Sequence, residues 1–417
     1  MEKIMKISIE KIGKIHHSDI IIDGLTIIAG KNSTGKSTVS KSLFAIFNSF
    51  YKITQTYRSY KERAIKSRIL DLDNYFDIFF FNENPIDLNK VVLKLISTQT
   101  EEDIKKVLNL YSLNEQLSES NFQKLILAIY KINQSTMQQV LYEETNNYFE
   151  SEFSSNINNV NSKHEIGSIK LKIKNEQIET YFQNDKLIDI PNFFSLNFKP
   201  IYIDDPFIID TINQTDFRMF RSDSETNRTH RQVILSQYNK KESENPIDKI
   251  IIKEDIQIIY DKIEKILDEN GTGIVYSYNR GNEDKKVLSI DNLSSGMKTF
   301  YLLKKLIENG TIEPNSPVIL DEPEVHLHPE WQLVLAEIIV LMQKYMNLNF
   351  LINSHSPYFV RAIEVYSTKY AIDSKTKYYL AKIENDLSEF EDVTGNVSEI
   401  YKILAKPFQK IENERFI

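Results

Sequence analysis

The sequence contains no cysteine among its 417 residues, which excludes disulfide bonds and zinc sites with thiolate ligands. It also lacks any run of about 18 consecutive apolar residues, the length that a membrane helix needs. The best candidate, 333–342, is short and is interrupted by Glu337. The first residues lack the apolar core of a signal peptide. We therefore expect a cytoplasmic protein with no membrane partner.

Glycine is scarce, with 11 residues, so glycines at the spacing of a motif carry more information than usual. Hydrophobic residues make up 41% of the chain, enough to bury a full core and to build more than one domain. The formal net charge of −8 argues against coating a polyanion with the whole surface, while a local basic patch stays compatible with nucleic-acid binding.

Strand and helix patterns alternate along much of the chain, which is typical of an α/β fold. Helices are expected to begin at Lys36 and Ser295, and the helical stripe at 256–267 predicts another. The apolar spacing predicts strands at 4–9, 20–22, 25–28, 201–203, 273–278, 287–290, 318–320 and 350–353.

Residues 51–198 differ in character, with few glycines, many Asn and Gln, and helical apolar spacing. Ser120 and Gln123 predict a capping box at the start of one helix. Residues 169–182 alternate like a β-hairpin. We expect an inserted, mainly helical domain with a β-hairpin at 51–198, and a discontinuous main domain formed by 1–50 and 199–417.

A glycine-rich segment lies between a predicted strand and a predicted helix and fits the pattern G-x-x-x-x-G-K-[ST]. In such a loop backbone N–H groups and the helix N-terminus cradle phosphates, the lysine neutralises the β and γ oxygens, and the hydroxyl holds Mg²⁺. A plain strand–helix turn is the alternative, and the placement disfavours it. The predicted phosphate-binding residues are Gly30, Lys31, Asn32, Ser33, Thr34, Gly35, Lys36, Ser37 and Thr38.

The apolar run 318–320 ends in Asp321 and Glu322. In this arrangement the first carboxylate reaches Mg²⁺ and the second polarises the attacking water. A lone acidic pair is often only a solvated strand end, so its meaning depends on nearby motifs. Three accompany it: Leu-Ser-Ser-Gly-Met-Lys at 293–298, Pro-Glu-Val-His-Leu-His-Pro at 323–329, and Asn-Ser-His-Ser-Pro at 353–357.

These motifs, in this order, resemble the ABC-type heads of the SMC, recombination-repair and OLD-family ATPases over about 1–50 and 199–385. The segment after Glu322 resembles the OLD-like branch and the ATPase subunits of antiphage systems such as PtuA of Septu and AriA of PARIS. The resemblance implies a P-loop NTPase head, a mixed sheet with flanking helices, that uses ATP and Mg²⁺. It implies catalytic roles for Glu322 and His355, Mg²⁺ binding by Ser37 and Asp321, and γ-phosphate binding by the signature residues Ser294, Ser295, Gly296 and Lys298.

Because each motif occurs once, the resemblance implies that the signature comes from a second chain and that a homodimer closes around ATP. Only about 60 residues follow His355, too few for an appended Toprim nuclease, so we expect an ATPase without intrinsic nuclease activity. The leading hypothesis is an ATP-gated ATPase that controls a separate effector, a nuclease in antiphage defence. A DNA repair or chromosome ATPase that clamps DNA itself is the alternative, and a transporter ATPase subunit is third.

Several polar residues have two interpretations. The basic stretch Lys52–Arg68 predicts contact with a nucleic-acid backbone, but a solvated helix face is the interpretation that we favour. His326 and His328 suggest a metal pair, but the loop they share fits the family. Gln214 is a candidate for the glutamine that senses γ-phosphate between the lobes, and an ordinary surface glutamine is the alternative.

Overall fold

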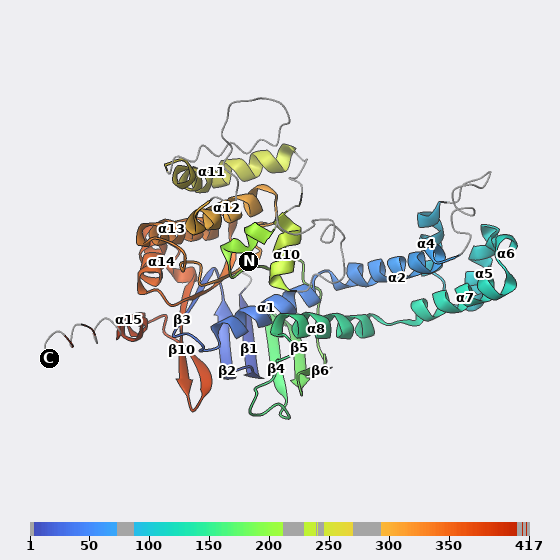
Figure 1. Ribbon diagram of the computed structural model, residues 1–417, viewed down its shortest axis with the longest axis horizontal. Coiled ribbons are helices and arrows are strands. Elements are labelled where there is room, and N and C mark those ends of the chain that lie inside the picture. The colour runs from blue at the N-terminus through green and yellow to red at the C-terminus, as the bar shows by residue number, and fades with distance from the viewer. Residues whose placement is uncertain are drawn as a thin grey trace. The chain divides into compact units, whose positions relative to one another are not determined.

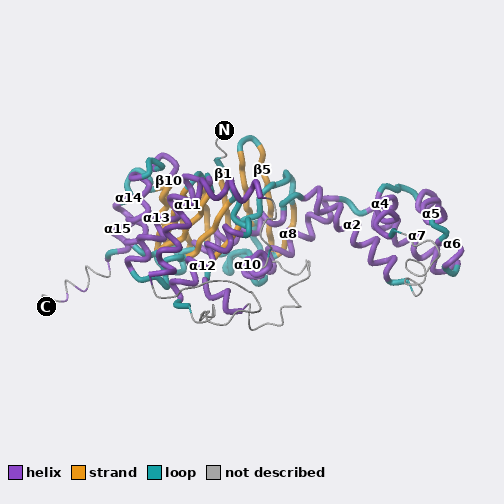
Figure 2. Tube along the Cα trace, turned by 90° about the horizontal axis from the view of Figure 1, so that it is seen from above, coloured by secondary structure: helices purple, strands orange, loops and turns teal. Residues whose placement is uncertain are grey.

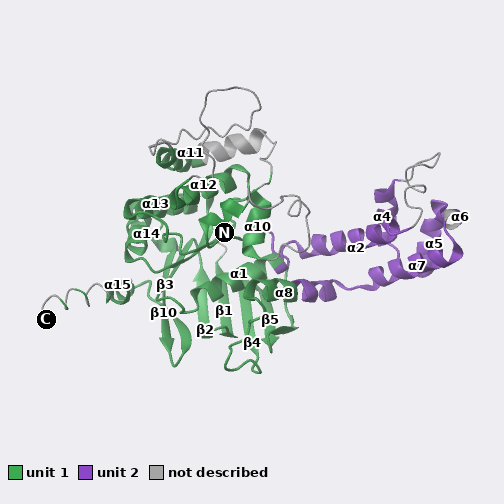
Figure 3. Cartoon of the chain, in the orientation of Figure 1, with its two compact units in different colours: residues 1–48, 145–194, 198–417 green, residues 49–144, 195–197 purple. Residues whose placement is uncertain are grey.

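The computed structural model describes residues 4–72, 87–211, 229–238, 240, 246–269, 293–406, 411 and 414. The chain forms two compact units (Figure 3). The head comprises residues 1–48, 145–194 and 198–417, and the helical unit comprises residues 49–144 and 195–197. Gln214 and the strands expected at 273–278 and 287–290 lie outside the described residues.

The head is built on one mixed sheet, which has eleven strands among the described residues (Figure 1). Their spatial order is β6-β5-β4-β1-β2-β11-β10-β3-β9-β8-β7. The five strands from β10 to β7 are parallel, and the wing from β6 to β2 is antiparallel. The strands are β1 (Met5–Ile12), β2 (Ile15–Ile22), β3 (Leu25–Gly30), β4 (Gly167–Ile173), β5 (Glu176–Gln183), β6 (Lys186–Asp189), β7 (Ile201–Ile203), β8 (Pro317–Asp321), β9 (Asn349–Ser354), β10 (Thr376–Glu384) and β11 (Leu387–Asp392).

Helices flank this sheet, which confirms the α/β expectation (Figure 2). Among the described helices, none is both long enough and apolar enough to cross a membrane. The helical elements of the head are α1 (Lys36–Ser49), the end of α8 (Met137–Phe153), η1 (Pro206–Asp210), α10 (His230–Tyr238), α11 (Pro246–Glu269), α12 (Ser295–Glu308), α13 (Pro329–Met346), α14 (Pro357–Lys369), η3 (Asp373–Lys375) and α15 (Ser398–Leu404).

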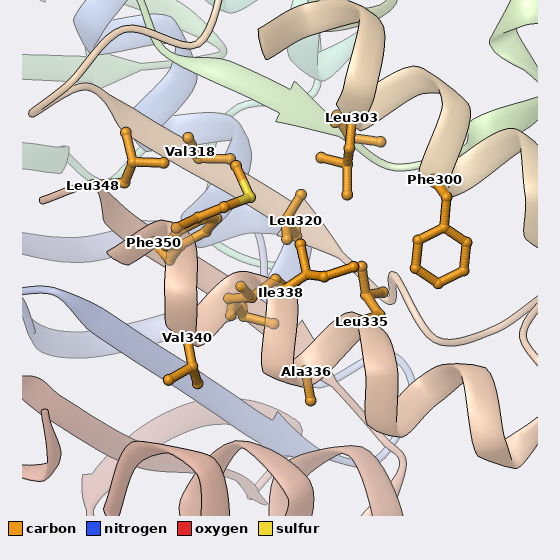
Figure 4. Packing of buried hydrophobic residues seen from close by; sticks show 14 of the residues in the cluster. Phe300, Leu303, Val318, Leu320, Leu335, Ala336, Ile338, Val340, Leu348 and Phe350 are labelled. Atoms are coloured by element: carbon orange, nitrogen blue, oxygen red, sulfur yellow. The ribbon is translucent and has the colours of Figure 1, made fainter. Parts of the chain in front are cut away.

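The central strands of the head are continuous apolar runs that belong to its hydrophobic core. Every residue of β3 and β8 is buried, because parallel strands in the middle of a sheet are covered on both faces. Apolar side chains of α12 and α13 pack on the sheet, including Phe300, Leu303 and Leu335 (Figure 4). Full burial of such a side chain contributes roughly 1.5–3 kcal/mol. The core therefore fixes the strand ends that carry the polar motifs.

The helical unit has its own apolar core, formed by residues such as Ile65, Val91, Leu108 and Ile129. Its helices are α2 (Ile53–Leu70), α4 (Leu88–Ile96), α5 (Glu101–Leu110), α6 (Leu113–Gln116), α7 (Glu119–Gln134) and the first part of α8.

The capping box expected at Ser120 and Gln123 is wrong, because α7 begins earlier. Ser118 is the N-cap, and its hydroxyl accepts a hydrogen bond from the Asn121 N–H at 3.3 Å. The Gln123 amide donates to the Glu119 carboxylate instead. A serine two residues upstream caps the helix equally well, so spacing alone does not decide the boundary.

The hairpin forms as expected, but it lies in the head. Strand β4 pairs with β1 from Met5↔Ile173 to Glu10↔Ser168, so the hairpin extends the head sheet. A two-stranded hairpin alone is marginal in water, and β1 offers the edge that stabilises it. The structure therefore places 145–194 in the head, whereas the sequence boundaries assign 51–198 to the insertion.

Candidate nucleotide-binding site

The glycine-rich loop connects the buried strand β3 to α1. Gly35 has a φ of 80°, and a Cβ there would meet Ile15 Cγ1 at 3.2 Å, so both conformation and space require glycine. The Lys36 Nζ donates to the carbonyl oxygens of Gly30 at 3.1 Å and Lys31 at 2.8 Å. Burial lowers the pKa of Lys36, while the charges of Glu322, Asp321 and Glu324 oppose this shift. The loop and the acidic strand end therefore meet in the fold.

Asp321 ends β8 and is held from both sides. The Tyr202 hydroxyl on β7 donates to its Oδ2, and the Asn353 amide on β9 donates to its Oδ1, each at 3.0 Å. The same amide lies 2.8 Å from Ser40 Oγ on α1. Each carboxylate oxygen accepts one of these bonds and keeps further acceptor capacity. The Asp321 carboxylate is thus held in a fixed orientation.

Glu322 occupies a strained backbone position at the end of the same strand. Its φ of 50° lies in the left-handed region, which costs a residue other than glycine about 1–3 kcal/mol. Its N–H donates to the Asn353 carbonyl at 2.9 Å, which holds the conformation. Its Oε1 lies 3.3 Å from the Nδ1 of His355. The fold thus brings together the two residues predicted to be catalytic.

Glu324 fixes the segment that presents His355. Its Oε1 accepts hydrogen bonds from Ser354 Oγ at 2.6 Å, the His355 N–H at 3.1 Å and the Ser356 N–H at 3.2 Å. Its side chain is 2% exposed, and burial raises the pKa of this carboxyl. Sequence reasoning assigned no role to Glu324, although the second glutamate of the Glu-Pro-Glu segment was the available signal.

Ser37, Asp321 and Glu322 line one cavity of about 280 Å³. The Ser37 hydroxyl and the Asp321 carboxylate are hard oxygen donors, which suit Mg²⁺. The exposure of Ser37 and the further acceptor capacity of Asp321 fit a metal ion bound with phosphate oxygens. The predicted Mg²⁺ residues are therefore close enough to share a site with Glu322.

The predicted signature residues separate into two groups at the start of α12. Ser294 is exposed, and Ser295 Oγ lies 3.5 Å from the His326 carbonyl oxygen. Gly296 is buried, and a Cβ there would lie 2.6 Å from Trp331 Cε3, so this glycine is required by packing inside the subunit.

Lys298 also makes its contacts within the subunit. Its Nζ donates to both carboxylate oxygens of Asp210, at 2.6 and 2.7 Å, and it is 3% exposed. The Lys298 charge is therefore already neutralised by Asp210 within the subunit, which disfavours a contact between Lys298 and a nucleotide.

The two histidines of the acidic loop have different surroundings. His326 lines the cavity and packs edge-on against the Phe207 ring, with centroids 5.0 Å apart. His328 is the N-cap residue of α13. The ring contact of His326 and the helix-capping position of His328 both favour structural roles for these histidines.

Cations of the basic stretch make contacts within the helical unit. Lys61 donates to the Asn133 carbonyl at 2.9 Å, and Arg58 pairs with Glu62 at 3.1 Å. Arg63 lies over the Tyr60 ring. These contacts favour a structural role for part of the stretch.

Comparison with known proteins matches residues 25–361 to the family model described as "AAA domain, putative AbiEii toxin, Type IV TA system". A curated relative, the "Retron Vc95 probable ATPase" of Vibrio cholerae serotype O1 biovar El Tor, is 22% identical over 368 residues. The match covers 80% of this chain and 66% of that protein, so the chain spans just under two thirds of the relative's length.

Solved structures of SMC heads are also similar. An SMC head bound to the C-terminal winged-helix domain of ScpA has a TM-score of 0.40 at 11% identity, covering 95% of this chain and 99% of that one. The SMC head domain from Thermotoga maritima has a TM-score of 0.37 at 11% identity, covering 94% and 99%. The family model reaches from β3 through the acidic strand end to α14 and so includes every residue of the site described above. The chain therefore belongs to this AAA-domain family.

Proposed function

We propose that this chain binds ATP with Mg²⁺, hydrolyses it in sites shared by two heads, and thereby gates a separate effector, a nuclease in antiphage defence. The observation that carries the ATPase part is that Ser37, Asp321 and Glu322 line one cavity. The charge of Lys36, next to Ser37, interacts with those of Asp321 and Glu322, and the Nδ1 of His355 lies 3.3 Å from Glu322 Oε1.

The residues divide the chemistry between them. Lys36 neutralises phosphate oxygens, and the Glu322 carboxylate accepts a hydrogen bond from the attacking water and orients it. The carboxylates of Glu322 and Glu324 lie 3.3 and 3.9 Å from His355 Nδ1 and orient the ring, and we assign its Nε2–H as a donor to the γ-phosphate. When bound by Ser37 and Asp321, Mg²⁺ supplies charge neutralisation at the β and γ oxygens.

The position of the signature supports sharing between two chains. Within one chain the cavity is lined by α12 residues beyond its first turn, Thr299, Leu302 and Leu303. Ser294 lies exposed at the start of that helix. A helix N-terminus with exposed hydroxyls is suited to bind an anion presented by another molecule. We infer that Ser294 and Ser295 bind the γ-phosphate held by the partner.

The effector part of the proposal is supported by the relatives. The family description names a type IV toxin–antitoxin system, and the curated relative is named for a retron. Both names refer to larger systems, which supports an ATPase that works together with other components.

The ATPase proposal is tested with the full chain and two matched substitutions. Glu322→Gln should lower the rate of Mg²⁺-dependent ATP hydrolysis by about 100-fold or more, because general-base assistance is lost. Its ATP affinity, measured by calorimetry, should stay within about twofold of the original, since the amide keeps the shape of the side chain. Glu330→Gln, at an exposed position of α13, should leave the rate unchanged. Hydrolysis by Glu322→Gln at the original rate would remove Glu322 from the mechanism.

The effector proposal is tested in cells that carry the gene with its native neighbours. Lys36→Ala should abolish protection against phage in a plaque assay, because the ATP cycle is lost. Protection that is insensitive to this substitution, or DNA cleavage by the purified chain alone, would contradict ATP gating of a separate nuclease. ATP hydrolysis that is strongly stimulated by DNA in the purified chain would favour the DNA-clamping alternative.

A further inference from the structure

We propose that His230 is a positioning residue for the magnesium-binding carboxylate Asp321 and that it acts through Tyr202. Glu152 and Asp204 hold His230 in place for this purpose. This inference rests on the proposed ATPase function, since it concerns how the metal ligand is oriented. None of the sequence motifs includes His230, Tyr202 or Glu152.

The ring of His230 lies between two acids from distant parts of the chain, the buried Glu152 and the partly buried Asp204. Its Nδ1 lies 2.6 Å from Glu152 Oε1 on α8, and its backbone N–H donates to Glu152 Oε2 at 3.0 Å. Its Nε2 lies 3.0 Å from Asp204 Oδ2, in the loop after β7. The Glu152 side chain is 1% exposed. The imidazole therefore has a fixed position and orientation.

The charges of this cluster are compensated. Burial disfavours the imidazolium, but hydrogen bonds with Asp204 and Glu152 outweigh it and raise the pKa of His230 to about 9. Arg231, the next residue on α10, donates to the same Asp204 Oδ2 at 2.7 Å. Moving one member away from its partner would leave a charge unpaired, which is costly. The members of the cluster are therefore held in place.

The ring of His230 transmits this rigidity to Tyr202. The two rings are stacked, with centroids 4.1 Å apart and an interplanar angle of 25°. Phe44 on α1 closes the aromatic group, 6.0 Å from each ring. Tyr202 is 1% exposed, and its hydroxyl donates to Asp321 Oδ2 at 3.0 Å.

The contact between Tyr202 and Asp321 gives the cluster a role beyond stability. Groups that hydrogen-bond a metal ligand set its orientation, and their loss typically lowers metal affinity by about 10–100-fold. Tyr202 occupies this position for Asp321, and His230 fixes the ring of Tyr202. A purely structural ion cluster would change the stability of the head without selectively changing how Mg²⁺ strengthens ATP binding.

The test measures the Mg²⁺ enhancement of ATP binding in the full chain with Glu322→Gln, so that ATP stays intact. Calorimetry gives the Kd of ATP in EDTA and in Mg²⁺, and their ratio is the enhancement. Tyr202→Phe keeps the ring and removes the hydroxyl, so we expect the enhancement to fall about tenfold while the Kd in EDTA is unchanged. His230→Gln should lower the enhancement as well.

The double variant identifies the route. If His230 acts through the Tyr202 hydroxyl, His230→Gln added to Tyr202→Phe should cause no further loss of enhancement. Glu337→Gln is the matched control, because the buried Glu337 forms an ion cluster with Lys262 and Lys369 outside the site. It should lower the melting temperature and leave the enhancement unchanged.

The outcomes separate this inference from the proposed function. An unchanged enhancement in a folded His230→Gln or Tyr202→Phe variant, or losses that multiply in the double variant, would overturn the positioning role alone. If His230→Gln fails to fold, Glu152→Gln replaces it with the same expectation. Failure of the parent chain to bind ATP would overturn the proposed function as well.

Discussion

At the scale of single residues, nucleotide binding depends on the charge of Lys36. Its ammonium is 4% exposed and interacts with the charges of Glu322, Asp321 and Glu324. In Lys36→Ala these carboxylates would face the triphosphate without the lysine ammonium that offsets its charge. We expect ATP affinity to fall by more than about 100-fold in calorimetry, because charge-assisted contacts to phosphate are among the strongest in proteins.

The matched control for this prediction is Lys402→Ala at an exposed position of α15, which should bind ATP normally. Circular dichroism should show that both variants are folded. Normal ATP affinity in Lys36→Ala would reject the assignment of the glycine-rich loop as the phosphate site.

His230 gives a residue-scale prediction about stability and pH. Hydrogen bonds with Asp204 and Glu152 overcome the effect of burial and raise its folded pKa to about 9, above its ordinary 6.5. The charges and polar groups that face it are Glu152 from α8, Asp204 and Tyr202 from β7 and its loop, and Arg231 from α10.

A raised folded pKa means that the stabilisation is fully present below pH 6.5 and is lost as the pH rises through about 9. Between these values the folded state binds one more proton than the unfolded state. Each unit of rise in pH therefore lowers the free energy of unfolding by up to about 1.4 kcal/mol through this group. The melting temperature should fall from pH 7 to pH 9, and less steeply in His230→Gln. Parallel curves for the two proteins would show that His230 does not titrate in this way.

At the scale of elements, the start of α12 carries a packing residue, Gly296, next to a proposed phosphate-binding residue, Ser295. Gly296→Leu should lower the melting temperature by several degrees, because a Cβ alone would lie 2.6 Å from Trp331 Cε3. Ser295→Arg should leave the melting temperature nearly unchanged, since Ser295 is half-buried and its hydroxyl makes only a 3.5 Å contact. Differential scanning calorimetry checks both. Equal destabilisation would mean that Ser295 is also a packing residue.

The elements that carry the site were predictable because their signals are local. The strands β3, β8 and β9 are apolar runs buried on both faces, and each is followed directly by its polar motif. The order of strands in the sheet was not predictable, because pairing such as β1 with β4 joins residues far apart in sequence. Local pattern contains no information on that pairing.

Contacts made by single polar side chains were predictable only where a motif defined them. Glu322 and His355 meet as expected, while Lys298 turns to Asp210 in η1, which no spacing indicated. The His230 cluster escaped prediction because its members come from three distant segments and belong to no motif. Such groups form where the fold buries charged residues side by side, and the sequence alone does not show which residues these are.

At the scale of the whole molecule, each motif occurs once per chain, so the proposed shared site would take its signature from a second copy. Ser37, Asp321 and Glu322 line one cavity, His355 Nδ1 lies 3.3 Å from Glu322, and Ser294 is exposed at the start of α12. If the signature acts on the partner's nucleotide, ATP becomes the link between two heads and hydrolysis separates them. Association should then depend on ATP, on the loop and on the signature together.

The most direct test of this shared site is the mass of the Glu322→Gln chain in solution, measured by analytical ultracentrifugation with and without Mg²⁺ and ATP. We predict a shift from the monomer mass of 48.8 kDa to twice that value when ATP is added. Glu322→Gln combined with Ser295→Arg should bind ATP with the same affinity and remain monomeric, because its loop is intact and its signature is blocked. ATP-bound Glu322→Gln that stays monomeric, or a combined variant that dimerises equally well, would contradict the shared-site account.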